Sequence, residues 1–156
     1  TETPAIRNVN KKGVKIKYIV KKQIYENLLR KIKTKSGYVN VSSIEMTVFD
    51  LIIYQKEIGG LNRAVEVIDE LSEELNFENL NEQYFKTIPI TIIQRLGYLI
   101  EKVIKNQKLS SQLFQKALKC EIKFRKTLLK PENIVKKFNY DEKWKIIKNI
   151  NIKLEE

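Results

Sequence analysis

The chain contains no histidine and only one cysteine, Cys120, among its 156 residues. A single thiol cannot form a disulfide within the chain, and it cannot supply the set of Cys and His ligands that a zinc site normally uses. The absence of histidine also excludes Ser-His-Asp and Cys-His catalytic groups. Composition alone therefore excludes Cys/His zinc sites and catalytic groups that depend on histidine.

Glycine, proline and long apolar runs are also scarce. Five glycines and three prolines argue against a low-complexity chain, and 42% hydrophobic with 31% charged residues is a soluble, globular balance. No apolar run approaches the ~20 residues that a membrane-spanning helix needs. No secretory signal opens the chain, and its first residue is Thr1 rather than Met. We expect a cytoplasmic fragment of a longer protein, folded as one domain over residues 1–156, with no cofactor.

Positive charge is abundant and unevenly placed. The net charge is +11, and it divides into +6 over residues 1–22, +3 over 23–42, −8 over 43–85 and +10 over 86–156. A positive field attracts nucleic acid and acidic protein surfaces. The candidate contact residues for nucleic acid or a partner are Lys11, Lys12, Lys15, Lys17, Lys21 and Lys22. The same lysines are also expected on the solvent face of an edge strand, where they block aggregation, so both roles stay open.

The first part of the chain has strand-like patterns. Residues 14–20 alternate between apolar and polar side chains, which predicts a half-buried strand with Lys15, Lys17 and Lys21 on one face. Residues 28–43 resemble a hairpin, with Ser36 and Gly37 as the candidate turn. The pattern then changes to a helical period.

A helix is expected over residues 44–56, capped by Ser42 or Ser43, and Gly59-Gly60 marks its end. A cleaner amphipathic helix is expected over residues 61–75, and further helices over 87–104 and from Ser110 or Ser111. The tail, from Trp144 to Leu154, alternates again. We therefore predict an α+β fold, in which a largely antiparallel sheet from N- and C-terminal strands surrounds a central block of packed helices.

One aspartate, Asp50, interrupts the apolar helix. It lies on a polar stripe with Ser43, Thr47 and Tyr54. A buried carboxylate needs a partner because desolvating a lone charge is costly. Arg95 is the candidate partner, since it is the one arginine in a similarly apolar helix. We predict a structural ion pair between Asp50 and Arg95, with membership of a functional site as the alternative.

Two stretches invite comparison with enzymatic motifs. Glu121-Ile-Lys123 has the carboxylate-x-lysine spacing of metal-dependent nucleases, but it arises readily by chance in a chain with 19 acidic and 30 basic residues. Gly59-Gly60 is not followed by the Lys-Ser/Thr pair of a phosphate-binding loop. We predict no catalytic residue and no metal ligand, and hence a protein that is not an enzyme.

The helical half carries a family resemblance. The stretches VSSIEMTVFDLIIYQKEIGGLNRAVEVIDELSEEL and PITIIQRLGYLIEKV resemble the C-terminal domain of AbiEi-type antitoxins, from the type IV toxin–antitoxin systems of bacterial abortive infection and phage defence. The tail DEKWKIIKNINIKLE also resembles the family's closing strand. The matching positions are Ser43, Glu45, Thr47, Asp50, Leu51, Gly59, Gly60, Leu61, Arg95, Leu96, Gly97, Tyr98 and Leu99.

The resemblance implies a division of labour. Family members combine an N-terminal winged helix-turn-helix, which binds the promoter of their own operon as a transcriptional regulator, with a C-terminal domain that neutralises a nucleotidyltransferase-like toxin. We expect this chain to be the antitoxin domain without its DNA-binding part. Its expected partners are the toxin and, through the missing domain, operator DNA; no membrane partner is expected. The alternative is a stand-alone basic nucleic-acid-binding module.

Overall fold

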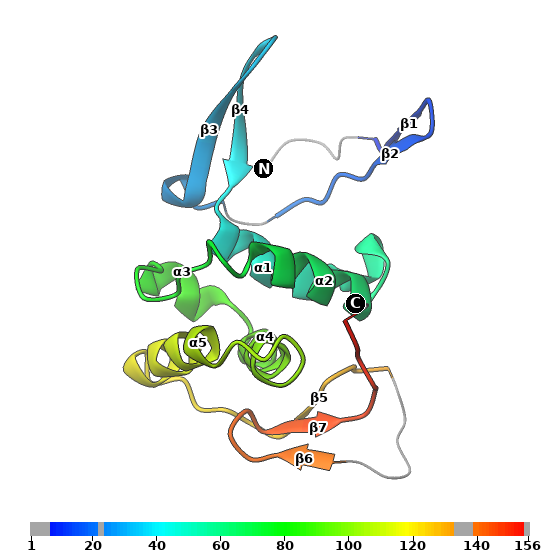
Figure 1. Cartoon of the computed structure of the whole chain (residues 1–156). Helices are drawn as coiled ribbons and strands as arrows, with labels where there is room; N and C mark the ends of the chain where they lie inside the picture. The colour runs from blue at the N-terminus through cyan, green and yellow to red at the C-terminus, as the bar shows by residue number, and fades with distance from the viewer. Residues whose placement is uncertain (1–6, 22–23, 133–138, 155–156) are drawn as a thin grey trace. The chain divides into compact units, whose positions relative to one another are not determined.

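The computed structural model describes residues 7–21, 24–132 and 139–154. The chain divides into two compact units, Thr1–Val41 and Ser42–Glu156. Each unit has its own secondary structure (Figure 1).

The first unit consists of small hairpins. Strands β1 (Val9–Lys11) and β2 (Val14–Ile16) pair antiparallel, with Val9 opposite Ile16. A 3-10 helix, η1 (Glu26–Leu28), precedes β3 (Leu29–Thr34) and β4 (Gly37–Ser42), which pair with each other. The hairpin expected over residues 28–43 is confirmed, although its turn is Lys35-Ser36. The strand expected over 14–20 is shorter, because β2 ends at Ile16.

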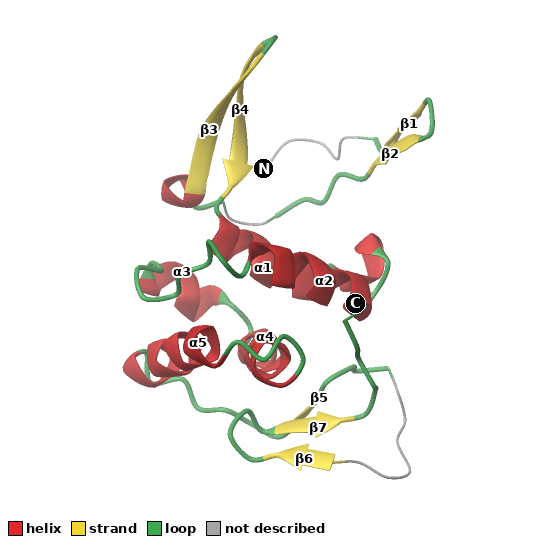
Figure 2. Cartoon of the chain, in the orientation of Figure 1, coloured by secondary structure: helices red, strands yellow, loops and turns green. Residues whose placement is uncertain are grey.

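The second unit begins with five helices (Figure 2). They are α1 (Ile44–Ile53), α2 (Leu61–Leu71), α3 (Glu82–Thr87), α4 (Ile90–Lys102) and α5 (Gln107–Lys119), with a 3-10 turn, η2 (Gln55–Ile58), after α1. Ser43 caps α1, since its side chain accepts a hydrogen bond from the Met46 amide at 3.3 Å. Gly59 ends η2 at φ 102°, a conformation that glycine adopts without strain.

The core of this unit is built around α4. Helix α4 contacts α1, α5 and the C-terminal strand β7 (Ile146–Lys148). Its apolar side chains Ile93, Leu96, Leu99 and Ile100 are fully buried. An aromatic cluster fills the space beside α1, where the ring of Phe49 lies 5.9 to 6.4 Å from the rings of Phe77, Tyr84 and Phe85.

The C-terminal strands form a separate small sheet. Strands β5 (Thr127–Leu128), β7 and β6 (Asn139–Asp141) lie in the order β5-β7-β6, parallel between β5 and β7 and antiparallel between β6 and β7. The α+β class is confirmed. The sequence predicted one sheet built from both N-terminal and C-terminal strands. In the structure, the described N-terminal and C-terminal strands belong to different sheets. Short hairpins satisfy their backbone hydrogen bonds locally and need no distant strand.

Over the described ranges, none of the helices combines the length and the apolar character needed to cross a membrane.

Trp144 packs into a slot that glycine creates on α4. Its indole is fully buried, and a Cβ atom at Gly97 would overlap the indole ring. Glycine inside a helix normally costs stability, so its presence here reflects close packing rather than helix propensity.

We therefore expect Gly97→Ala to destabilise the protein by about 1–3 kcal/mol, although alanine favours helix formation. Urea unfolding of the two proteins measures the difference. In a Trp144→Phe background the clash should shrink, so the same substitution should cost less there. An increase in stability on Gly97→Ala in the parent chain would show that the slot does not exist.

Candidate functional site

Helix α4 carries three polar side chains into the interior. Gln94 is fully buried, Arg95 is 9% exposed and Glu101 is 6% exposed. Buried polar groups are costly unless they are hydrogen-bonded, so each of the three should have a defined partner.

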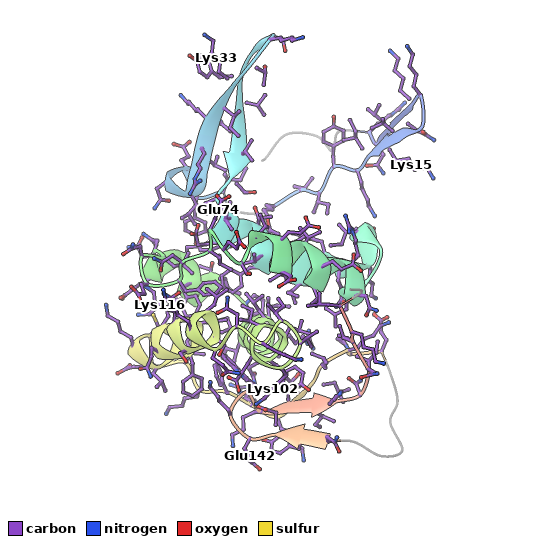
Figure 3. The ribbon with its side chains drawn as sticks, in the orientation of Figure 1. Lys15, Lys33, Glu74, Lys102, Lys116 and Glu142 are labelled. Atoms are coloured by element: carbon purple, nitrogen blue, oxygen red, sulfur yellow. The ribbon has the colours of Figure 1, made fainter. Side chains whose placement is uncertain are left out.

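Glu101 has the most complete set of partners. One carboxylate oxygen, Oε2, accepts hydrogen bonds from the Trp144 indole Nε1 at 3.0 Å, from Ser110 Oγ at 3.2 Å and from Lys143 Nζ. The other oxygen, Oε1, lies 2.7 Å from Lys102 Nζ. Lys102, labelled in Figure 3, lies at the end of α4 and also approaches Asp141 at 3.6 Å.

This arrangement fixes the charge of Glu101. Burial by itself raises the pKa of the Glu101 carboxyl, but hydrogen bonds from Lys102, Lys143 and Trp144 outweigh it and lower the pKa to about 2. The carboxylate is therefore ionised at neutral pH and anchors the indole that packs on Gly97.

Gln94 and Arg95 hold main-chain carbonyls of the C-terminal segment. Gln94 Nε2 donates to the carbonyl oxygens of Arg125 at 2.7 Å and Trp144 at 2.6 Å. Arg95 Nε donates to the carbonyl oxygen of Leu128 at 3.0 Å. Gln94 and Glu101 thus act together with Arg95 to attach the segment after α5 to α4.

The sequence predicts an ion pair between Asp50 and Arg95, and the structure shows different neighbours for each side chain. Asp50 lies half-buried on α1, where its charge adds to burial in raising the pKa of the Tyr54 phenol. Burial lowers the pKa of Arg95. The ion pairs between described residues do not include one between Asp50 and Arg95, so the pairing stays a prediction for experiment to decide.

A cavity of about 510 Å³ opens beside Arg95. Its walls come from the end of α1, from η2, from α4 and from the chain just before residue 133. Among the described residues, its charged lining consists of Lys56, Glu57, Arg95, Lys130 and Glu132. Lys56 forms an ion pair with Glu132.

The candidate lysines lie mainly on the surface of the first unit. Lys11, Lys12, Lys15 and Lys17 are exposed and Lys21 is partly exposed, while Lys22 lies outside the described residues. The sequence predicted that Lys15, Lys17 and Lys21 share one face of a strand. That prediction is wrong for Lys17 and Lys21, because β2 ends before both residues. In the β1–β2 hairpin, Lys15 is paired with Asn10 and Lys11 with Val14. Neighbouring pairs point to opposite faces, so Lys11 and Lys15 are also on different faces.

The remaining family positions have local structural roles. Glu45 lies in the first turn of α1, and Thr47 Oγ1 donates to the Ser43 carbonyl at 2.8 Å. Gly60 precedes α2 at φ 98°. Tyr98 is buried, which raises the pKa of its phenol. These contacts shape helix ends and the core.

The Glu121–Lys123 motif gains no supporting acidic cluster. Glu121 is exposed just after α5, with φ 57°. The described part of the chain holds no group of three or more His, Cys, Asp or Glu residues placed to bind a metal ion.

The helical block binds its own C-terminal segment through buried polar side chains, and the second unit is an α+β domain. A family model, that of the AbiEi antitoxin C-terminal domain, matches residues 6–102. The match covers more than half of the chain, and the chain belongs to this family. The family is regulatory and is not known as an enzyme family, and it implies a toxin as partner in general terms. Searches of curated proteins and of solved structures gave no significant match.

The sequence pattern does not single out Gln94, Glu101 and Trp144 as a group. A signal is present, because Gln94, Gly97 and Glu101 recur on one face of a helix at spacings of three and four residues. What the sequence cannot show is that Trp144, 43 residues beyond Glu101, returns to that face.

The low pKa of Glu101 makes stability depend on pH. Its contribution is fully present above the unfolded-state pKa near 4.5 and is lost as pH falls towards the folded-state pKa of about 2. The shift corresponds to about 3 kcal/mol. We therefore expect the stability advantage of the parent chain over Glu101→Gln to decrease by up to that amount between pH 6 and pH 2, measured by urea unfolding.

The matched control is Glu142→Gln, because Glu142 is an exposed carboxylate paired with Lys145 (Figure 3). Its effect on stability should change little over the same pH range, since exposed ion pairs contribute little. An equal pH dependence for the two substitutions would contradict the buried network.

A double-mutant cycle with Asp50→Asn and Arg95→Gln, each of which removes one charge, tests the predicted ion pair. Because Arg95 donates to the Leu128 carbonyl, we expect the effects of the two substitutions on unfolding free energy to add. A coupling energy of about 3 kcal/mol would instead establish the ion pair expected from the sequence.

Proposed function

We propose that the chain is the antitoxin domain of a type IV system and counteracts a nucleotidyltransferase-like toxin in the bacterial cytoplasm, without enzymatic activity of its own. The observation that carries the proposal is the family match over residues 6–102, which runs from the first described hairpin to the end of α4. Promoter binding belongs to a winged helix-turn-helix domain of the longer protein, and the lysines of this chain assist it through non-specific contacts with phosphates.

The growth of bacteria that express the toxin tests this proposal. The toxin gene next to the antitoxin gene is induced together with residues 1–156, with the longer protein that includes the DNA-binding domain, or with an empty vector. An inactive toxin variant serves as the control for the burden of expression.

We expect residues 1–156 alone to restore growth, because the proposal places antitoxin activity in this domain. Failure of both forms to restore growth, with each form soluble and present at the level of the toxin, would reject the antitoxin function. Rescue by the longer form alone would place the activity outside residues 1–156.

A second candidate function, general nucleic-acid binding, is favoured by the lysines on both hairpins. Lys15 on β2 and Lys31 and Lys33 on β3 are exposed, and Figure 3 labels Lys15 and Lys33. Lys31 and Lys33 lie on one face of β3 because strand residues two apart point the same way. Such side chains can contact phosphates without reading sequence.

If these lysines contact phosphates, replacing Lys15, Lys31 and Lys33 with glutamine should weaken binding to duplex DNA. The salt dependence should also fall, by roughly one unit of slope for each phosphate that is no longer neutralised. Fluorescence anisotropy at several salt concentrations measures both quantities. The control replaces three lysines of the second unit, Lys105, Lys108 and Lys153. Equal weakening by the two triple variants would show that net charge alone drives binding.

A further inference from the structure

The cavity beside Arg95 has an unusual cation in its wall. Arg95 is only 9% exposed, and the hydrogen bond that it forms among the described residues uses Nε and ends on a neutral carbonyl oxygen, that of Leu128. The ion pairs of the described residues provide it with no carboxylate. A buried cation of this kind is costly unless another group compensates its charge.

Arg95 lines the cavity and has hydrogen-bond donors beyond Nε. Over the described part of the chain, the side-chain polar atom that is fully enclosed without a hydrogen-bond partner is Gln112 Oε1, not an atom of Arg95. Because Nε is used and Arg95 lines the cavity, Nη1 and Nη2 are the guanidinium donors left for a ligand there. They present parallel N–H bonds that match the two oxygens of a planar anion.

The part of the cavity wall that contains Lys130 is held in place by hydrogen bonds to the C-terminal segment. Lys130, on the opposite segment, donates its backbone N–H to Asn149 Oδ1 at 2.8 Å and accepts a hydrogen bond from Asn149 Nδ2 at its carbonyl oxygen. Leu129 N–H donates to the Ile147 carbonyl at 3.0 Å. The segment is therefore fixed by the C-terminal sheet, and the volume of about 510 Å³ lies in the range of small-molecule sites.

The lining selects the kind of anion. Among the described residues, three cations and two carboxylates line the cavity, so these five side chains carry a net formal charge of +1. A singly charged anion balances this charge, whereas Glu57 and Glu132 repel a dianion such as phosphate more strongly. Ile52 and Ile92 supply buried apolar wall for an organic body. We propose that the cavity binds a small organic acid, with its carboxylate held by the terminal nitrogens of Arg95 and its apolar part against Ile52 and Ile92.

The site is independent of the proposed antitoxin activity, and its test uses binding alone. Butyrate, acetate and inorganic phosphate are titrated into residues 1–156 at constant ionic strength, with chloride as the reference salt. The backbone amide resonance of Gly60, which lines the cavity, reports binding by nuclear magnetic resonance.

We expect a saturable shift with butyrate, a weaker affinity for acetate because it lacks the apolar body, and weaker binding of phosphate. Arg95→Lys keeps the charge but removes the paired donors, so butyrate affinity should fall tenfold or more. Lys130→Gln should weaken it several-fold. Arg63→Lys is the control, because Arg63 is an exposed arginine on α2 paired with Glu66.

Lys130→Gln provides a second test if Arg95→Lys does not fold. This substitution should leave the fold intact, because the hydrogen bonds between Lys130 and Asn149 use the backbone of Lys130 and not its side chain. Three results would overturn the proposal: no saturable shift in the folded parent chain, unchanged butyrate affinity in both lining variants, or tighter binding of phosphate than of butyrate.

Discussion

The hydrogen bond between the Glu101 carboxylate and the Trp144 indole, 3.0 Å long, is the interaction on which the second unit depends most. It joins two residues far apart in sequence and brings the largest buried side chain of the core against Gly97. The carboxylate remains charged because lysine and indole donors outweigh the cost of burial. Removing the carboxylate would leave the buried indole N–H of Trp144 without this acceptor, which is costly in the interior of the protein.

The same helix organises the rest of the C-terminal segment. Gln94 and Arg95 bind carbonyl oxygens of Arg125, Leu128 and Trp144, all of which follow the matched family region of residues 6–102. Helix α4 is the last element of that region and provides the surface on which the remaining chain folds. This attachment also completes the cavity, since Lys130 forms part of its wall.

The sequence predicts the helices more successfully than the strands. Ser43 and the apolar periods place the starts of α1 and α2 correctly because their signals are local. Both helices end earlier than predicted, α1 at Ile53 rather than Lys56 and α2 at Leu71 rather than Leu75. The starts of α4 and α5 differ, since Pro89 and Asn106 occupy the cap positions where the pattern favours Thr and Ser. The tail reads as one alternating strand, but β7 contains only Ile146–Lys148. Trp144 lies in the turn before β7, where its indole fills the slot at Gly97.

The candidate site is harder to predict from the sequence than the helices are. Arg95 is recognisable as exceptional because a charge in an apolar helix is visible in the pattern, but its described hydrogen bond is to a backbone carbonyl, which has no side-chain signature. Glu101 lies in an ordinary charged helix end by sequence, and only the return of Trp144 makes it a buried centre. Long-range contacts of this kind depend on the completed fold rather than on local propensity.

The most direct test of the central role of Glu101 uses the one tryptophan of the chain. Its indole N–H gives a single resonance, whose exchange with solvent and pH dependence are measured by nuclear magnetic resonance. We predict strong protection from exchange at neutral pH, and a chemical shift that titrates well below pH 4, following the Glu101 pKa of about 2. Rapid exchange at neutral pH, or a titration near the ordinary carboxyl value of 4.5, would contradict the buried Glu101–Trp144 interaction.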